Sequence, residues 1–150
     1  MKQGTLVVIG LCGMLLGGCA SVPMTSASLD SEAKTFTPPP GKANIYVNRG
    51  GGLGTAVTVQ VILDGRVVGA LAPNTYMLLS VPPGEHVLST GAGAEKVEIQ
   101  KLNAEAGKNY FYRVSLAMGW VMARVHLRPM TEEEGRKAVL GSKRAEAVTF

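Results

Sequence analysis

From Ala43 onward, hydrophobic and polar residues alternate in short runs with a period of two. This period is typical of β-strands that bury one face and expose the other. The pattern predicts eight strands, over residues 43–48, 57–63, 66–71, 76–81, 86–90, 96–102, 110–118 and 121–128. Short strands with tight turns and little helix predict a mainly β protein, an antiparallel two-layer β-sandwich of about seven to eight strands.

The last two predicted strands show the alternation most clearly. Their core face should include Tyr112, Val114, Val125 and Leu127, with Val59 and Val61 packing in the same interior. Gly119-Trp120 between them is interpreted as a two-residue turn, which sets the register of the pair. That register places Arg113 opposite His126, Ser115 opposite Arg124 and Phe111 opposite Arg128.

A helix is predicted after the last strand. Thr131 followed three residues later by Glu134 forms a capping box, and the helix should extend to about Leu140. Residues 41–150 are therefore interpreted as one β-sandwich domain with a short C-terminal helix.

The first 18 residues have the features of a signal peptide. Lys2 supplies positive charge, residues 5–16 are nearly all apolar, and Leu16-Gly17-Gly18-Cys19 ends the segment. This ending resembles the bacterial lipoprotein signals, in which the cysteine receives a diacylglyceryl group and becomes the first residue after cleavage. The resemblance implies that Cys19 is lipidated, and Ala20 after it implies the outer membrane. A plain signal peptide and an N-terminal membrane helix are the alternatives.

Residues 19–40 are predicted to form a lipidated linker. Serine, threonine, alanine and proline dominate this stretch, and it lacks hydrophobic periodicity. Three prolines at residues 38–40 favour a stiff extended chain that would hold the domain away from the membrane. The alternative is a first strand of the domain before Lys42.

Cysteine usage and charge narrow the class of protein. Cys12 would leave with the signal peptide and Cys19 would carry lipid, so the mature domain would have no disulfide. Without Lys2 the chain carries 14 lysines and arginines against 11 aspartates and glutamates. This modest excess is unlike the clustered charge of a nucleic-acid-binding protein, so no nucleic-acid partner is expected.

Four short motifs occur in order along the domain. They are Pro39-Pro40-Gly41-Lys42-Ala43-x-Ile45-Tyr46-Val47, Val61-x-Leu63-Asp64-Gly65-Arg66-x-Val68-Gly69, Pro82-Pro83-Gly84-Glu85-His86 and Glu105-Ala106-Gly107-Lys108-x-Tyr110. Together they resemble a family of small bacterial lipoproteins whose domain has unknown function, over about residues 38–140. The second and third motifs are also similar to the PEGA β-sandwich modules. The resemblance implies an architecture and a location but no catalytic residues, and the motifs are interpreted mainly as determinants of the fold.

No constellation of residues in the sequence specifies a reaction. Ser31-Glu32-Ala33-Lys34 matches the Ser-x-x-Lys motif of penicillin-binding enzymes, but the companion motifs are missing, so the match is attributed to chance. His86 and His126 have no cysteine or acidic cluster at metal-ligand spacing. We therefore expect no metal, no cofactor and no enzymatic activity.

One group of residues is a candidate binding site. Arg113, Arg124, His126 and Arg128 would share the sheet face opposite the core and bind anionic groups such as lipid phosphates. The alternative is an ordinary solvated face, neutralised by the glutamates at 132–134.

The sequence thus predicts a lipid-anchored envelope protein, in the outer membrane and facing the periplasm. Its partners would be the membrane through Cys19 and either anionic lipid or another envelope protein. The expected role is a non-enzymatic binding or accessory module. The alternatives are a structural subunit of an envelope complex, with one sheet face covered by a partner, and, more remotely, a hydrolase.

Overall fold

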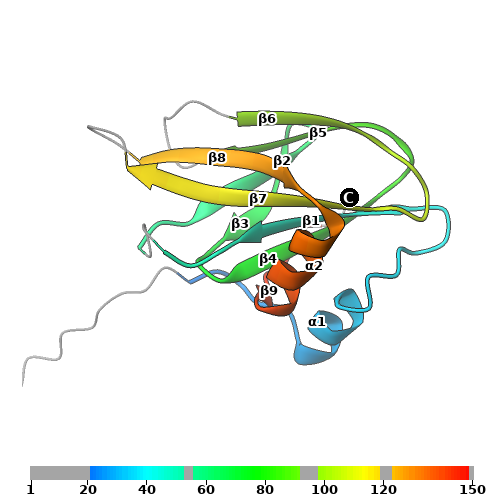
Figure 1. Ribbon diagram of the computed structural model, residues 1–150, viewed down its shortest axis with the longest axis horizontal. Coiled ribbons are helices and arrows are strands. Elements are labelled where there is room, and N and C mark those ends of the chain that lie inside the picture. Colours follow the sequence, from blue (N-terminus) through cyan, green and yellow to red (C-terminus); the bar gives the residue numbers. More distant parts are fainter. Residues whose placement is uncertain (1–20, 53–55, 92–97, 119–122, 149–150) are drawn as a thin grey trace, which may run out of the picture.

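The structure, a computed structural model, describes residues 21–52, 56–91, 98–118 and 123–148. Two β-sheets face each other as the layers of a sandwich, and two short helices lie against one of them (Figure 1). In chain order the elements are α1 (Ala27–Ala33), β1 (Ala43–Arg49), β2 (Val59–Leu63), β3 (Arg66–Leu71), β4 (Thr75–Val81), β5 (Gly84–Gly91), β6 (Glu98–Ala104), β7 (Asn109–Met118), β8 (Ala123–Met130), α2 (Glu132–Leu140) and β9 (Lys143–Arg144). The predicted mainly β sandwich with a C-terminal helix is confirmed.

The strand order differs from a purely antiparallel sandwich. One sheet has the order β8-β7-β1-β4-β9 and the other β3-β2-β5-β6. β1 runs parallel to β7, and β4 runs parallel to β9. The antiparallel prediction is therefore wrong for these two pairs. After β1 and β4 the chain passes through the second sheet before it returns, and such crossovers allow neighbouring strands to run in the same direction.

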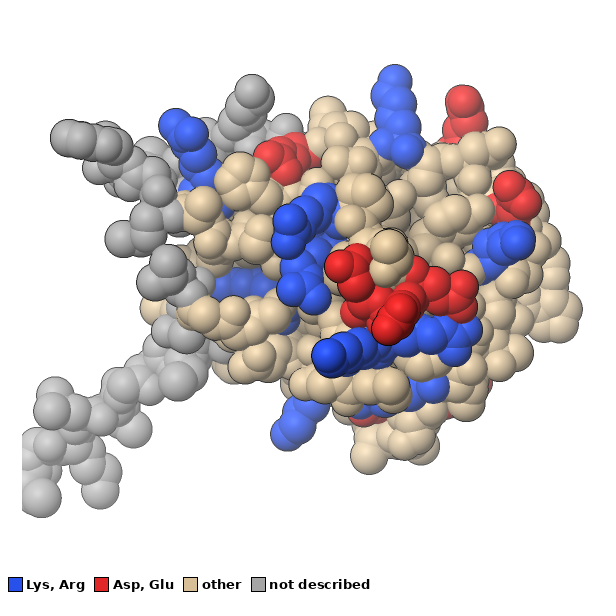
Figure 2. Space-filling model, in the orientation of Figure 1, with Lys and Arg blue, Asp and Glu red and all other residues tan. Residues whose placement is uncertain are grey.

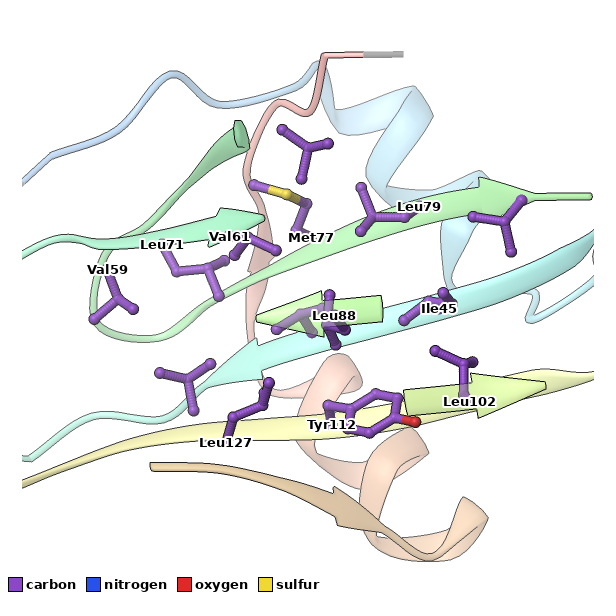
Figure 3. Packing of buried hydrophobic residues seen from close by; sticks show 14 of the residues in the cluster. Ile45, Val59, Val61, Leu71, Met77, Leu79, Leu88, Leu102, Tyr112 and Leu127 are labelled. Atoms are coloured by element: carbon purple, nitrogen blue, oxygen red, sulfur yellow. The ribbon is translucent and has the colours of Figure 1, made fainter. Parts of the chain in front are cut away.

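The main core fills the space between the two sheets. The predicted core residues Tyr112, Val114, Val125 and Leu127 are buried there together with Val59 and Val61, which confirms the predicted inward face. Figure 3 shows labelled side chains from both sheets, among them Ile45, Leu71, Met77 and Leu88, pointing into this space.

A second, smaller core lies on the outer face of the five-stranded sheet. It is formed by aromatic and aliphatic side chains from the sheet and from the chain around both helices: Ala33, Phe36, Tyr46, Tyr76, Phe111 and Val139. The rings of Tyr46 and Phe111 stack with centroids 5.0 Å apart. All seven residues of β1 are consequently buried, because the sheet is covered on both faces.

The α2 helix begins as predicted. The Thr131 hydroxyl accepts from the Glu134 backbone N–H, and the Glu134 carboxylate accepts from the Thr131 N–H at 3.1 Å. This capping box satisfies N–H groups that the first helical turn leaves without partners. No helix within the described ranges is long and apolar enough to cross a membrane.

The prediction of a linker over residues 19–40 is wrong for its described part, residues 21–40. Ser26 caps α1, the Thr25 N–H donates to the Arg144 carbonyl, and the Glu146 N–H donates to the Pro23 carbonyl. Ala33 and Phe36 are buried in the second core. Composition was a poor guide here because Ala33 and Phe36 meet an apolar surface on the sheet, and the polar side chains of Asp30 and Lys34 find partners on distant parts of the chain. The predicted signal peptide, Cys19 and Ala20 lie outside the described residues.

Candidate functional site

The predicted basic residues lie on β7 and β8, in a register that differs from the predicted one by two residues. Arg113 lies opposite Arg128, Ser115 opposite His126 and Ala117 opposite Arg124. The predicted turn at Gly119-Trp120 lies outside the described residues. Because β7 ends at Met118 and β8 begins at Ala123, the connection has four residues instead of two. A shift of two leaves every side chain on its predicted face, so only the pairing was wrong.

Arg113 and Arg128 border a hollow of about 300 Å³ together with Pro129, Met130 and Glu134. Figure 2 shows basic side chains over β7 and β8 beside acidic side chains near the start of α2. Hydrogen bonds from the Thr131 backbone and hydroxyl, followed by the charges of Arg113 and Arg128, hold the pKa of Glu134 below its usual value. Glu134 is therefore an anion already placed beside the two arginines.

His126 and Arg124 do not join this hollow. His126 Nδ1 lies 2.9 Å from Glu98 Oε1 on β6, and the same carboxylate accepts from the Leu127 N–H. Gln100 also reaches from β6 to the Leu127 carbonyl at 2.9 Å, so these side chains join the edges of the two sheets. Arg124 is exposed and lies four residues before Arg128, about 13 Å along the strand. Only two of the four candidate residues, Arg113 and Arg128, thus form a common site.

A second polar arrangement, centred on His86, was missed by the sequence analysis. His86 Nδ1 lies 2.7 Å from Asp64 Oδ2, and His86 Nε2 lies 2.8 Å from the Pro82 carbonyl oxygen. The other Asp64 oxygen accepts from the Val87 N–H at 2.8 Å. Burial alone would lower the pKa of His86, but the hydrogen bonds to Asp64 and Pro82 and the charge of Asp64 together raise it. Burial would raise the pKa of Asp64, but the hydrogen bond from the Val87 N–H, followed by the hydrogen bond and the charge of His86, lowers it.

The geometry favours a structural role for His86. Both ring nitrogens have an oxygen partner, so neither is open to take a proton from a substrate. The pair instead joins the turn after β2 to the start of β5 and, through the Pro82 carbonyl, to the turn before β5. The only sequence signal was that the second motif contains the Asp64-Gly65 turn and the third motif ends in His86. Their contact requires the pairing of β2 with β5, which places Leu63 opposite Leu88.

The four sequence motifs meet at one end of the sandwich, which we call the motif end. The Gly107 N–H donates to the Lys42 carbonyl, and the Asn44 N–H donates to the Lys108 carbonyl. Gly84 lies opposite Ala104, next to the His86–Asp64 pair. These contacts connect the turns that carry the four motifs. Their interpretation as determinants of the fold is compatible with this arrangement.

A cleft of about 380 Å³ opens between β3 and β4. Its wall is mainly aliphatic, and Asp64, Arg66, Ser80 and His86 supply its polar side chains; the other lining residues are Leu63, Val68, Leu78, Leu79, Val81, Pro82, Ala147 and Val148. Outside this cleft, Lys34 of the Ser-x-x-Lys match donates from its Nζ to Asp30 Oδ2 at 2.7 Å and to the Ser142 carbonyl at 2.8 Å. In the part of the chain that the structure describes, no three histidine, cysteine, aspartate or glutamate side chains are grouped to hold a metal ion.

Two comparisons with known proteins bear on the identity of the chain. The model of a family described as a protein of unknown function, DUF2846, matches residues 39–126, which contain all four motifs. An uncharacterized protein of Haemophilus influenzae is 32% identical over 133 residues, which cover 88% of this chain and 78% of that protein. The chain therefore belongs to the DUF2846 family.

Proposed function

We propose that the protein is a lipid-anchored protein of the bacterial outer membrane whose periplasmic domain acts as a non-enzymatic binding or accessory module. The observation that carries this proposal is the sequence Leu16-Gly17-Gly18-Cys19, placed directly before the folded part of the chain. The likeness of the second and third motifs to PEGA modules is compatible with such a role and stays a prediction.

The anchor is tested by replacing Cys19. Cys19→Ser removes the thiol that would accept the lipid, so the variant should leave the membrane fraction or accumulate as uncleaved precursor. Labelling with a radioactive fatty acid, followed by fractionation, measures both results. Cys12→Ser is the matched control and should keep the label. Unchanged labelling of Cys19→Ser would contradict the anchor.

The hollow between Arg113 and Arg128 supports binding of anionic lipid headgroups. Two arginines placed directly opposite each other on a sheet repel, and a phosphate that accepts from both guanidinium groups would relieve this repulsion. Because Glu134 borders the same hollow, a lipid phosphate would have to compete with its carboxylate.

Vesicle binding of the unlipidated domain, residues 21–150, tests this role. It should sediment with vesicles that contain phosphatidylglycerol and dissociate as salt rises. The double variant Arg113→Gln/Arg128→Gln should lose this binding, whereas Arg124→Gln, outside the hollow, should retain most of it. Equal binding to neutral phosphatidylcholine vesicles would contradict electrostatic recognition.

A second candidate function, a structural subunit of an envelope complex, is favoured by the outer face of the four-stranded sheet. The pairing places Val67, Ile62, Ser89 and Ile99 in one row across its four strands. Val67 is 50% exposed and Ile99 is 57% exposed. A photo-crosslinking residue at Ile99 should trap a neighbouring protein in intact envelopes, and one at Glu132 on the opposite face should not. Identical patterns from the two positions would contradict a partner on this face.

A further inference from the structure

The described chain starts two residues after Cys19 and is already in contact with the domain. Val22 is half-buried against the main core. Met24 forms a β-bridge with Ala145, and the Pro23 carbonyl accepts from the Glu146 N–H at 2.9 Å. The chain is therefore held in place from Val22 onward.

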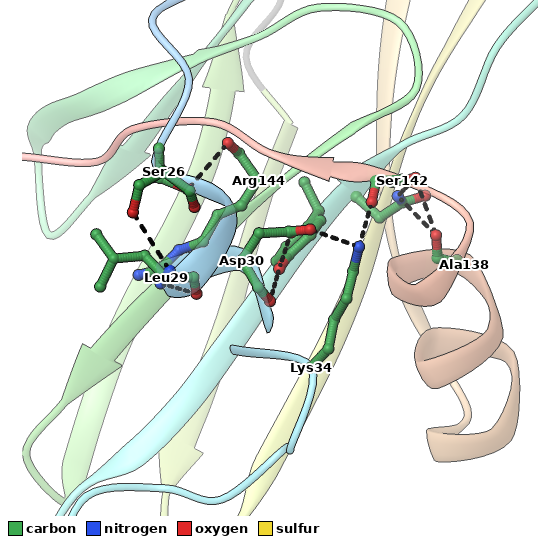
Figure 4. Close-up of polar contacts among 10 residues, drawn as sticks. Ser26, Leu29, Asp30, Lys34, Ala138, Ser142 and Arg144 are labelled. Atoms are coloured by element: carbon green, nitrogen blue, oxygen red, sulfur yellow. Dashed lines mark hydrogen bonds and ion pairs between the residues drawn. The ribbon is translucent and has the colours of Figure 1, made fainter. Parts of the chain in front are cut away.

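The segment that follows is held by a polar network around α1, drawn in Figure 4. Lys34 Nζ bridges Asp30 and the Ser142 carbonyl, and the Tyr76 hydroxyl donates to Asp30 Oδ1 at 2.7 Å. Arg144 also donates to the Leu29 carbonyl at 2.9 Å. We call α1 and these contacts the latch. Because the latch and the contacts of residues 22–25 hold the chain, it provides no long spacer between Cys19 and the domain.

The length of a peptide chain now limits how far the lipid attachment point can be from the fold. Two residues, Ala20 and Ser21, lie between Cys19 and Val22, so three Cα–Cα steps join them and their Cα atoms are at most about 11 Å apart. An acylated cysteine has its sulfur at the membrane interface, since its acyl chains occupy the hydrocarbon layer. The surface around Val22 would then lie within a headgroup's reach of the bilayer.

That surface is one end of the sandwich, which we call the anchor end. A shallow hollow there is lined by Ser21, Val22, Met24, Ala72, Pro73, Asn74, Thr75, Gly141 and Lys143. Met24 is 39% exposed, and Lys143 is exposed at the start of β9. An exposed thioether beside a lysine suits the headgroup region, where apolar and anionic groups alternate.

The anchor end and the motif end are opposite ends of the same strands. β1 and β4 pair from Arg49 with Thr75 at the anchor end to Ala43 with Val81 at the motif end. Seven residues of extended chain put about 20 Å between these ends.

We propose that the anchor end lies against the phospholipid surface and that the motif end points away from the membrane, where a partner in the periplasm can reach it. This proposal rests on the lipidation of Cys19 proposed above. The predicted linker would hold the domain away from the bilayer. In the arrangement proposed here, the domain lies directly against the bilayer.

The test compares two matched single-cysteine variants of the full chain, expressed with its signal segment and purified in the lipidated form. Lys143→Cys places a label at the anchor end, and Lys108→Cys places the same label at the motif end; both lysines are exposed. Since Cys12 would be removed and the Cys19 sulfur would carry lipid, each variant would have one free thiol. A fluorescent donor on that thiol is measured against acceptor-labelled headgroups in phosphatidylethanolamine–phosphatidylglycerol vesicles.

Energy transfer should be several-fold greater from position 143 than from position 108. Inserting a long Gly-Ser segment between Ala20 and Ser21 should remove most of this difference. Equal transfer from the two labels, with lipid labelling of Cys19 intact, would overturn the orientation while leaving the anchor in place. Absence of lipid from the purified protein would overturn the anchor and the orientation together.

Discussion

The outer faces of the two sheets carry comparable rows of side chains in different surroundings. On the five-stranded sheet, the pairing aligns Met130, Phe111, Tyr46 and Leu78. On the four-stranded sheet, it aligns Val67, Ile62, Ser89 and Ile99. The first row packs in the second core beside α1 and α2, whereas Val67 and Ile99 in the second row are exposed.

The difference shows what a sheet face needs in order to be covered. The covered face has aromatic rings whose hydroxyls reach polar groups of the latch: Tyr46 donates to the Ala33 carbonyl at 2.8 Å, and Tyr76 donates to Asp30. Burial raises the pKa of Tyr46 to about 12, so its hydroxyl remains a donor. The row on the other face is aliphatic apart from Ser89, and none of its four side chains is an aromatic ring with a hydroxyl. Rings that combine a large apolar surface with a hydroxyl therefore both bury and orient the segments above them.

The largest contrast between the faces should come from matched truncations. Phe111→Ala should lower the free energy of unfolding by about 3–5 kcal/mol, because it leaves a cavity under α2. Ile99→Ala, on the uncovered face, should change it by less than about 0.5 kcal/mol. Urea denaturation of the two variants measures the difference. Similar losses at both positions would mean that the four-stranded sheet is also covered in solution, for example by a second copy of the chain.

A smaller effect is expected where α2 approaches the sheet. A Cβ at Gly135 would lie 2.2 Å from Phe111 Cγ, so Gly135→Ala requires the helix or the ring to move. We expect a loss of about 1–3 kcal/mol from this overpacking, although alanine favours a helix over glycine by about 1 kcal/mol.

Gly141→Ala is the control for that substitution. Gly141 ends α2 with a φ of −82°, and a Cβ there would come no closer than 3.7 Å to another residue. Its melting temperature should stay near that of the unchanged protein. If both variants were equally destabilised, loss of glycine in or beside the helix would be the cause, and not the contact with Phe111.

The latch should contribute about 1–2 kcal/mol to the free energy of unfolding, as expected for a charged group with two hydrogen-bond partners. Burial opposes ionisation of Asp30, but the contacts with Lys34 and Tyr76 outweigh it and lower its pKa. Its stabilising effect is therefore present above the ordinary aspartate pKa and is lost as pH falls through the lowered value. Asp30→Asn should speed hydrogen exchange of α1 amides, while Glu32→Gln, exposed on the same helix, should not. Unchanged exchange in Asp30→Asn would show that apolar burial alone holds the latch.

The smallest expected effect concerns the four-stranded sheet, whose outer face has no helix packed on it in the described part of the chain. There the His86–Asp64 pair joins the turn after β2 to the start of β5. Since the pKa of His86 is raised in the folded protein, its stabilising effect is complete below about 6.5, the usual histidine value, and declines as pH rises through the raised value. Unfolding midpoints measured across this range should fall for the unchanged protein, but less for His86→Gln. The same slope in His86→Gln would assign the pH dependence to other groups.

Local patterns along the chain were sufficient to predict most of the strands and the start of α2. β3 was predicted over 66–71 and occupies Arg66–Leu71, because Asp64-Gly65 marks its start and alternation marks its length. Asp64 and Gly65 both adopt the positive φ that this turn requires, at +50° and +78°. The capping box at Thr131 marked the start of α2 in the same way.

Contacts between distant segments decided the rest. A seven-residue helix such as α1 is unstable alone, and it exists here because Ala33 and Phe36 meet the aromatic face of the sheet. The register of β7 and β8 depended on a connection two residues longer than the predicted turn, and the partner of His126 came from β6 in the other sheet.

The sequence by itself determined the alternation that builds the strands, the turns between them, the inward face of Tyr112, Val114, Val125 and Leu127, and the helix cap at Thr131. These features depend on interactions within a few residues of chain or on the side-chain period of a strand. The tertiary structure alone decided the parallel pairing of β1 with β7, the latch, the His86–Asp64 contact and the separation of Arg124 and His126 from Arg113 and Arg128. Each of these joins groups far apart in the chain, and their partners are set by how the two sheets and the helices pack, which no local pattern encodes.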